Sequence, residues 1–300
     1  MKKIALIHPG RAYLPELEAY CHYFAQRGWQ IDVLSQTTEN QLLTYDVEWH
    51  LLGIDRFSKS PNRLKIHEYI SLSVPPGASL KNWLKRTLNT RPDLRIFHNK
   101  AVQQGFRFND GVPFRFRGAG VGQHFFHTTP TAKRYDFVYH GAMDPTRQLD
   151  RWLPLFVERF PNYSLLLVGE PGYLQQRFSA YANIHFAGRV PYAHIPAWLR
   201  QAEYGLNFIP ETYPYDRQPS LKLLEYCALH LKIITTSYAW VKQFVQLHSG
   251  QFFVVDKDWR NFYPHNITNF EYHTPDVTEY QWDKILNASG IADFLETYWQ

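Results

Sequence analysis

The segment YSLLLVG, residues 163–169, decides the fold class of this chain. Its apolar run ends at a glycine, and such a run is typical of a parallel strand that is buried on both faces. The preceding segment TRQLDRWLPLFVERF, residues 146–160, carries its large apolar residues at helical spacing. A helix followed by a buried strand is the repeating unit of an α/β fold, in which helices cover a parallel sheet.

The same alternation extends through the second half of the chain and is repeated at its start. Further strands are expected at 135–141, 184–187, 204–209, 232–236 and 251–255, and helices at 172–181, 191–201, 220–229 and 238–247. In the first half, strands are expected at 3–8, 30–34, 94–98 and 112–117, with a helix at 14–26. We therefore expect an α/β protein with two Rossmann-like domains that face each other across a cleft. Ligands of such sheets bind outside the carboxyl ends of the strands.

The polar stretch at residues 128–133 lies between two strand-rich blocks and marks the expected domain boundary. The first domain is expected at residues 1–130 and the second at residues 131–278. Within the first, residues 55–92 are polar and basic and show no regular pattern. Residues 279–300 carry spaced apolar side chains and are expected to form a helix that packs near the domain junction.

The positive charge of the chain is concentrated in its first part. The 300 residues have a net charge of +5, but residues 1–130 hold 17 Lys and Arg against 10 Asp and Glu, whereas residues 131–300 have a net charge of −2. This asymmetry favours an anionic partner such as nucleic acid, an anionic membrane face or a phosphorylated substrate. The alternative is an ordinary solvated surface. The candidates for the contact surround Trp83 and Leu84 and are Lys81, Lys85, Arg86, Arg91 and Arg95.

Composition excludes several classes of protein. The aromatic share of 17% is too high for a disordered chain. Two cysteines, Cys21 and Cys227, cannot form a disulfide framework or a cysteine-based zinc site. No apolar run is long enough to cross a membrane, and the N-terminus lacks the features of a signal peptide. We therefore expect a cytoplasmic protein.

Three generic ligand motifs carry little weight in this sequence. The segment GAGVG at residues 118–122 lacks the spacing of a dinucleotide fingerprint, and no phosphate-binding P-loop is present. Asp256 and Asp258 form a D-x-D pattern after an expected strand, as a metal clamp for a nucleotide sugar would. The pattern comes too late to leave room for an acceptor-binding region, so we favour a solvated helix start and expect no metal site.

Four segments, in order, give a more specific signal. They are VYHGAMDPTRQL (138–149), LLLVG (165–169), the stretch that begins IHFAGRVP (184–191) and runs to residue 204, and QPSLKLLEY (218–226). Together they resemble the donor-binding half of the retaining glycosyltransferases of the GT-B fold, in the large group-1 family. The last segment resembles the family signature P-x-K-x-x-E and is the most discriminating. The resemblance covers about 110 residues well and the first 130 only in outline.

The resemblance implies a glycosyltransferase that moves a sugar, hexosyl or related, from a nucleotide-sugar donor to an acceptor with retention of configuration. It implies a donor-binding second domain, a first domain that faces the acceptor, and a metal-independent reaction that requires no cofactor besides the donor substrate. The basic first domain then suits a glycan, lipid-linked or phosphorylated acceptor and a peripheral contact with the inner face of an anionic membrane. No recognition motif supports a specific nucleic-acid partner.

The resemblance also implies the site. Fixed positive groups stabilise the leaving phosphate, and Arg147 and Lys222 occupy the matching positions. The amides of Ser220 and Leu221 open a helix, and Glu225 matches the residue that holds the ribose hydroxyls. The remaining candidates are Gly10, Gly141, Arg189 and Asp216 for donor binding and His98 for catalysis, with His124 and His127 as rivals of His98.

The sequence departs from the family pattern at two positions. Arg217 stands where the family carries an acid, with Asp216 beside it, and Ala142 replaces a basic residue next to the glycine turn. We expect Asp216 to take over the acidic role or the sugar to be held differently, and Arg189 or Arg217 to compensate for Ala142. These departures keep a non-catalytic nucleotide-sugar-binding protein of the same fold as the alternative function. A protein that acts on nucleic acid is a third hypothesis, because the chain is basic and aromatic.

Overall fold

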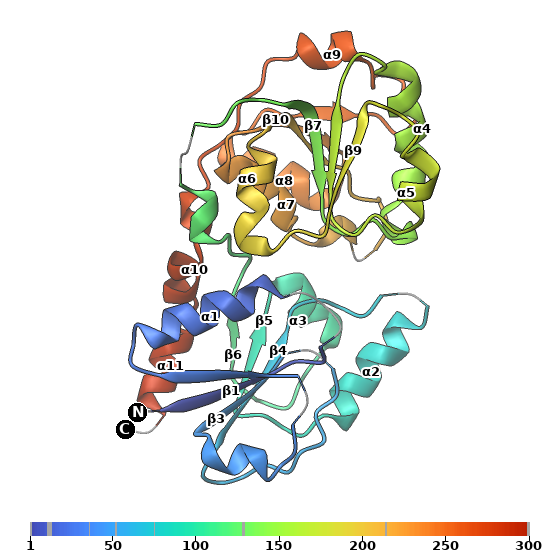
Figure 1. Cartoon of the computed structure of the whole chain (residues 1–300). Coiled ribbons are helices and arrows are strands. Elements are labelled where there is room, and N and C mark those ends of the chain that lie inside the picture. Colours follow the sequence, from blue (N-terminus) through green and yellow to red (C-terminus); the bar gives the residue numbers. More distant parts are fainter. Residues whose placement is uncertain are drawn as a thin grey trace. The chain divides into compact units, whose positions relative to one another are not determined.

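The computed structural model describes residues 2–10, 14–35, 37–51, 53–74, 76–127, 130–213 and 215–298 (Figure 1). The chain divides into two compact units. The first unit consists of Met1–Gly122 and Glu279–Gln300, and the second of Gln123–Thr278. The division thus falls just before the expected boundary stretch, of which residues 128 and 129 lie outside the described residues. The segment after residue 278 belongs to the first unit.

The first unit contains a parallel sheet of six strands in the order β2-β1-β3-β4-β5-β6. Its strands are β1 (Lys3–Ile7), β2 (Gln30–Leu34), β3 (Val47–Leu51), β4 (Leu64–Tyr69), β5 (Leu94–Phe97) and β6 (Phe114–Phe116). Its α-helices are α1 (Pro15–Ala25), α2 (Ala78–Leu88), α3 (Lys100–Phe106), α10 (Trp282–Ser289) and α11 (Ile291–Thr297).

Both central strands of this sheet, β3 and β4, are absent from the sequence-based prediction. They lack a clean apolar run because charged side chains are buried in them, and the ammonium of Lys65 is fully buried. Lys65 Nζ lies 2.7 Å from Glu48 Oε1 and 2.8 Å from Asp55 Oδ2, while His67 Nε2 lies 2.9 Å from the same Asp55 oxygen. Arg63 Nε also pairs with Glu48, at 2.8 Å. Such burial is tolerated only when each charge has a close partner.

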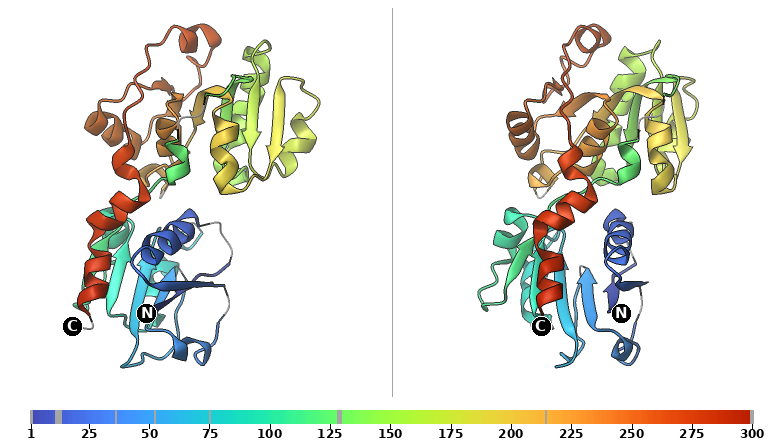
Figure 2. Two further views of the ribbon diagram at one scale, coloured as in Figure 1. Left: turned by 60° about the vertical axis from the view of Figure 1, so that its left-hand side comes forward. Right: turned by 90° about the vertical axis from the view of Figure 1, so that its left-hand side faces the viewer.

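The other face of this sheet packs against α1 and the C-terminal helices. Trp49 and Ile66 of the sheet share one core with Tyr20 of α1 and with Trp282 and Leu295. Figure 2 shows the C-terminal helices in red beside this sheet. Gly120 permits the approach of α10, because a Cβ atom there would lie 2.3 Å from the Trp282 ring. The tail therefore completes the core of the first unit.

The second unit also contains a parallel sheet of six strands, in the order β12-β11-β10-β7-β8-β9. Its strands are β7 (Tyr135–His140), β8 (Leu165–Val168), β9 (Ile184–Gly188), β10 (Ala202–Asn207), β11 (Lys232–Thr236) and β12 (Phe253–Val255). Its α-helices are α4 (Leu149–Arg159), α5 (Tyr173–Phe178), α6 (Ile195–Leu199), α7 (Leu221–Ala228), α8 (Ala239–His248) and α9 (Pro264–Thr268). The predicted strand–helix alternation is confirmed here, and the strand order reverses between β7 and β10.

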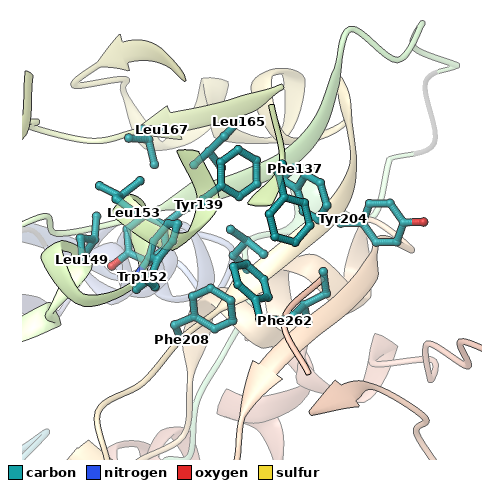
Figure 3. Close-up of a cluster of buried hydrophobic side chains, with 14 of the residues drawn as sticks. Phe137, Tyr139, Leu149, Trp152, Leu153, Leu165, Leu167, Tyr204, Phe208 and Phe262 are labelled. Atoms are coloured by element: carbon teal, nitrogen blue, oxygen red, sulfur yellow. The ribbon is translucent and has the colours of Figure 1, made fainter. Parts of the chain in front are cut away.

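Aromatic side chains build the core of the second unit. The ring centroid of Phe137 in β7 lies 5.3 Å from that of Phe156 in α4 and 5.0 Å from that of Tyr204 in β10. Figure 3 shows Phe137 and Tyr204 within this cluster. Trp152 and Phe208 extend the cluster toward the carboxyl ends of the strands. This packing accounts for much of the high aromatic content. Across the described ranges, none of the helices is both long and apolar enough to span a bilayer.

Candidate functional site

Three neighbouring strands of the second unit end in glycine. Gly141, Gly169 and Gly188 follow or close β7, β8 and β9, and all three have positive φ. Gly141 N donates to Val168 O at 3.0 Å, and Gly169 N donates to Gly188 O at 2.9 Å. A Cβ atom on Gly169 would lie 2.2 Å from Gly141 O, so this position requires glycine. The strand ends therefore present bare backbone at the edge where ligands of such sheets bind.

Helix α7 begins beside these strand ends. Ser220 is its N-cap residue, whose hydroxyl donates to Asn207 Oδ1 at 2.6 Å and accepts from Leu223 N at 3.4 Å. Tyr226 fixes the helix against β10, because a Cβ atom on Gly205 would lie 2.7 Å from its ring. The first amides of α7, which include that of Leu221, are thus held next to the point where the strand order reverses. Such a helix N-terminus favours anions.

Two cations lie together at this edge. Lys222 Nζ stacks 3.9 Å from the centroid of the Tyr139 ring, and a Cβ atom on Gly141 would lie 3.9 Å from the same nitrogen. Burial lowers the pKa of Lys222 well below its usual range, and the charge of Arg147 lowers it further against the opposing effect of Glu225. Arg147 Cζ lies 5.0 Å from the centroid of Tyr215. Among the described residues, no carboxylate forms an ion pair with either cation. Two unneutralised cations of this kind favour a bound anion.

Glu225 is 1% exposed and is held from both sides. Its Oε2 lies 2.7 Å from His140 Nε2, and its Oε1 accepts from the Tyr192 hydroxyl at 2.8 Å. Sequence reasoning did not assign His140 or Tyr192 to the site. The position of His140, directly before the glycine at the end of β7, was an available signal, whereas nothing in the sequence pairs Tyr192 with Glu225.

The other candidates of the second unit lie at the border of this cluster. Asp216 is partly buried, and Arg217 Nε lies 4.0 Å from its Oδ2 while the Arg217 side chain is mostly exposed. Arg189 is exposed and directly follows Gly188. No ion pair among the described residues joins Arg189 or Arg217 to Glu225. The compensation expected for Ala142 therefore stays a prediction.

Two candidates, Gly10 and His98, lie in the first unit. Gly10 follows β1 and His98 follows β5, so both lie at carboxyl ends of that sheet. Burial, with a smaller effect of the Arg117 charge, lowers the pKa of His98 to about 3. The rivals His124 and His127 lie in the second unit, where Arg200 binds their carbonyl oxygens. The other eight candidates also lie in the second unit.

A cavity of about 660 Å³ lies at the carboxyl ends of β10 to β12 and includes Arg147 in its wall. Trp152, Phe208 and Trp259 form its apolar lining, and Arg151 and Lys242 are also part of the wall. The D-x-D carboxylates line the same cavity, but Arg260 lies 3.9 Å from Asp256 and 3.3 Å from Asp258. Within the described ranges, no cluster of three or more His, Cys, Asp or Glu side chains is arranged to hold a metal ion.

Comparison with solved structures identifies the fold class. Sucrose-phosphate synthase from Thermosynechococcus elongatus superposes with a TM-score of 0.65 at 12% identity, covering 99% of each chain. HepE from Anabaena in complex with UDP-glucose superposes with a TM-score of 0.64 at 12% identity, covering 98% of this chain and 95% of HepE. A glycosyltransferase from Rickettsia africae gives 0.54 at 10% identity, covering 98% of each chain. The chain therefore has the two-domain α/β architecture of the GT-B fold, as its sequence predicted. No family model and no curated protein matches its sequence.

Proposed function

We propose that the protein is a glycosyltransferase that transfers a sugar from a nucleotide-sugar donor. The observation that carries this proposal is that Arg147 and Lys222 lie together beside the N-terminus of α7, and that neither forms an ion pair with a carboxylate among the described residues. A donor diphosphate matches this arrangement in charge. The structures with the same fold include proteins named as glycosyltransferases and one that was solved with UDP-glucose.

The chemistry of transfer follows from these charges. When the bond between sugar and diphosphate breaks, negative charge grows on the leaving phosphate, and preorganised positive groups lower the barrier. Arg147 and Lys222 supply these groups, and the amides of Ser220 and Leu221 add the positive end of the α7 dipole. Gly141 gives the phosphate access to the backbone. The leaving phosphate itself deprotonates the acceptor, so the sugar is transferred with retention and without a protein nucleophile.

Ribose recognition falls to Glu225 in this proposal. Its Oε1 already accepts from the Tyr192 hydroxyl and its Oε2 lies 2.7 Å from His140 Nε2, so the ribose hydroxyls either join these contacts or displace the Tyr192 hydroxyl. His98 of the first unit acts on the acceptor side, and Gly10, Arg189 and Asp216 contact the donor. The reaction is hexosyl or related transfer without a metal, in the cytoplasm, to a glycan, lipid-linked or phosphorylated acceptor.

The direct test is an activity assay with a panel of UDP-, GDP- and ADP-sugars, in which donor hydrolysis and sugar transfer are both followed. One donor should be turned over, and Arg147→Ala should reduce kcat by about 100-fold, because a charge-assisted contact contributes about 1.5–3 kcal/mol. Arg177→Ala, on the surface helix α5, is the matched control and should retain full activity. Equal rates for the Arg147 and Arg177 variants would refute the assigned role of Arg147.

A non-catalytic nucleotide-sugar-binding protein is the second candidate function. Two residues favour it: Ala142 replaces a basic residue of the family pattern, and Arg217 replaces an acid. Tight binding of one nucleotide sugar without hydrolysis or transfer, in the presence of acceptor mixtures, would support this alternative over the enzyme.

A further inference from the structure

Helix α2 of the first unit is oriented with polar residues toward the domain. Asn82 Oδ1 accepts from Ser73 N at 2.9 Å, and Asn89, directly after the helix, accepts from Asp55 N at 2.8 Å through its Oδ1. Lys85 is partly buried on the same side. None of the α2 residues is buried, and Figure 1 shows the helix at the outer edge of its unit. Polar contacts therefore attach this helix to its domain.

Three large apolar side chains of α2 are exposed to solvent. Leu80 is 60% exposed, Trp83 49% and Leu88 44%, and Val74 just before the helix is 40% exposed. The three helical residues are spaced as one stripe of an α-helix. In an ordinary surface helix the apolar stripe faces the core. Here it faces solvent, and an exposed apolar patch of this kind requires a physical reason.

The segment that carries the stripe has charges of a single sign. Residues 69–92 contain no Asp or Glu, but they contain Lys81, Lys85, Arg86 and Arg91. A helix that combines an exposed Trp and Leu stripe with flanking basic residues has the chemistry of a helix that lies in the interface of an anionic bilayer. There the apolar side chains enter the acyl boundary while the cations meet the lipid phosphates. A protein partner would more often combine both signs of charge at its rim.

We propose that α2, together with Val74, is a docking surface for an anionic phospholipid membrane, and that the helix lies flat on the bilayer. The stripe supplies the apolar contact, and Lys81, Arg86 and Arg91 supply the attraction, whereas Lys85 lies on the side of the domain. The first unit thereby reaches the membrane surface, where lipid-linked acceptors reside. The inference gives a specific surface to the membrane contact expected from charge alone, and it is independent of the sugar-transfer reaction, because binding to lipid is measured without donor.

The test is co-sedimentation of the whole protein with vesicles of phosphatidylcholine alone and of phosphatidylcholine mixed with phosphatidylglycerol, whose negative charge attracts basic segments. The protein should bind the anionic vesicles at low salt, and binding should fall as salt rises. Leu80→Glu should reduce the partition coefficient roughly ten-fold or more. The substitution removes a leucine that the bilayer would bury, and it adds a negative charge that the anionic lipids repel. Lys81→Glu should reduce it by at least about five-fold.

The matched control is Leu247→Glu on α8 of the second unit, where Leu247 is 76% exposed. This variant should bind vesicles as the wild type does, and circular dichroism should show that every variant is folded. Absence of binding to anionic vesicles at low salt would overturn the proposal, as would equal losses in the Leu80 and Leu247 variants. A size-exclusion shift from dimer to monomer on Leu80→Glu, without any vesicle binding, would assign the stripe to a second copy of the chain instead. If the wild-type protein binds the anionic vesicles but transfers no sugar from any donor, the proposed function is contradicted and the docking surface is not.

Discussion

His140 Nε2 lies 2.7 Å from Glu225 Oε2, and this contact joins the end of β7 to helix α7 across the point where the strand order reverses. It couples the glycine turn at Gly141 to the helix whose first turn carries Lys222. The glycine turn and the first turns of α7 are thus held together by this pair and by the hydrogen bond that His140 N donates to the Tyr226 hydroxyl at 3.1 Å.

Removing His140 should destabilise the protein. His140→Ala leaves the buried Glu225 carboxylate with the Tyr192 hydroxyl alone, and an unsatisfied buried group costs about 1–3 kcal/mol. Urea denaturation should show this loss in the free energy of unfolding. His185→Ala, on the exposed face of β9, is the control and should change stability by less than about 0.5 kcal/mol. Equal stability of both variants would show that the pair is not structural.

Gly169 should not tolerate a side chain. Gly169→Ala places Cβ 2.2 Å from Gly141 O at a φ of 147°, so the backbone of two strand ends must shift. We expect a loss of about 3 kcal/mol or more in stability together with loss of nucleotide binding. Gly172→Ala is the control, because its Cβ would meet nothing within 4 Å and only its positive φ of 51° is unfavourable, at about 1 kcal/mol. Gly169→Ala combines the clash of Cβ with Gly141 O and an unfavourable φ, whereas Gly172→Ala has only the unfavourable φ. Thermal denaturation should therefore give a lower melting temperature for Gly169→Ala, and equal melting temperatures would contradict the predicted clash.

Donor binding should depend on pH through Lys222. Because burial lowers the pKa of this ammonium, and a bound diphosphate would raise it again, binding takes up a proton at any pH between the two values. Affinity for a nucleotide sugar should be constant while Lys222 is protonated in the free protein. It should fall by up to about ten-fold per pH unit as the pH rises through the pKa of the free protein.

Calorimetric titration in buffers of different ionisation enthalpy measures this proton uptake directly. A nucleotide sugar is the suitable probe, since its diphosphate carries no group that titrates near neutral pH. Lys222→Met should abolish the proton uptake and weaken binding. Proton uptake that persists in Lys222→Met would assign it to another group.

The buried ion pairs of the first unit should be costly to break. Lys65→Met leaves Glu48 and Asp55 buried without their shared cation, and such a change costs about 3–5 kcal/mol. Lys59→Met, an exposed lysine that pairs with Asp93, is the control and should cost less than about 1 kcal/mol. Chemical denaturation would test the difference. A Lys65 variant as stable as the Lys59 variant would show that the buried carboxylates are neutral.

The free energy of unfolding should also fall in acid, because protonation of Asp110 removes its ion pair with Arg95. The hydrogen bonds from Arg95 lower the pKa of Asp110 to about 2, below the value of the unfolded chain near 3.8. The group therefore stabilises the folded state above about pH 4, and this contribution disappears as the pH falls toward 2. Asp110→Asn should remove this part of the acid dependence in urea melts at pH 2–5. An unchanged acid profile in the variant would contradict the assignment.

The sequence predicts the second unit far better than the first. Apolar runs that end in glycine, such as LLLVG at 165–169, predict buried parallel strands, and the structure confirms every strand expected there. Strands β3 and β4 could not be found in this way, because Glu48 and Lys65 are buried in them and their partners are distant in sequence. Helix α2 was missed although Leu80, Trp83 and Leu88 recur at helical spacing, because the many polar and basic residues of this segment resemble those of a loop.

The candidate site shows the same division. Arg147, Lys222 and Glu225 could be chosen from a motif, because the resemblance fixes their positions relative to the glycine turn and to α7. The contact of Glu225 with Tyr192 could not, since it depends on how the turn after β9 packs against α7. Long-range contacts of this kind are set by the tertiary fold and leave no local pattern in the sequence.

The central claim is that Arg147 and Lys222 bind the diphosphate of a nucleotide-sugar donor. Isothermal titration with UDP-, GDP- and ADP-glucose, on the wild type and on Arg147→Ala, tests it most directly. The account predicts that one of the three binds and that Arg147→Ala weakens its affinity by about 10- to 100-fold, while Arg177→Ala leaves it unchanged. Binding that is equally strong in wild type and Arg147→Ala, or no binding of any of the three, would contradict it.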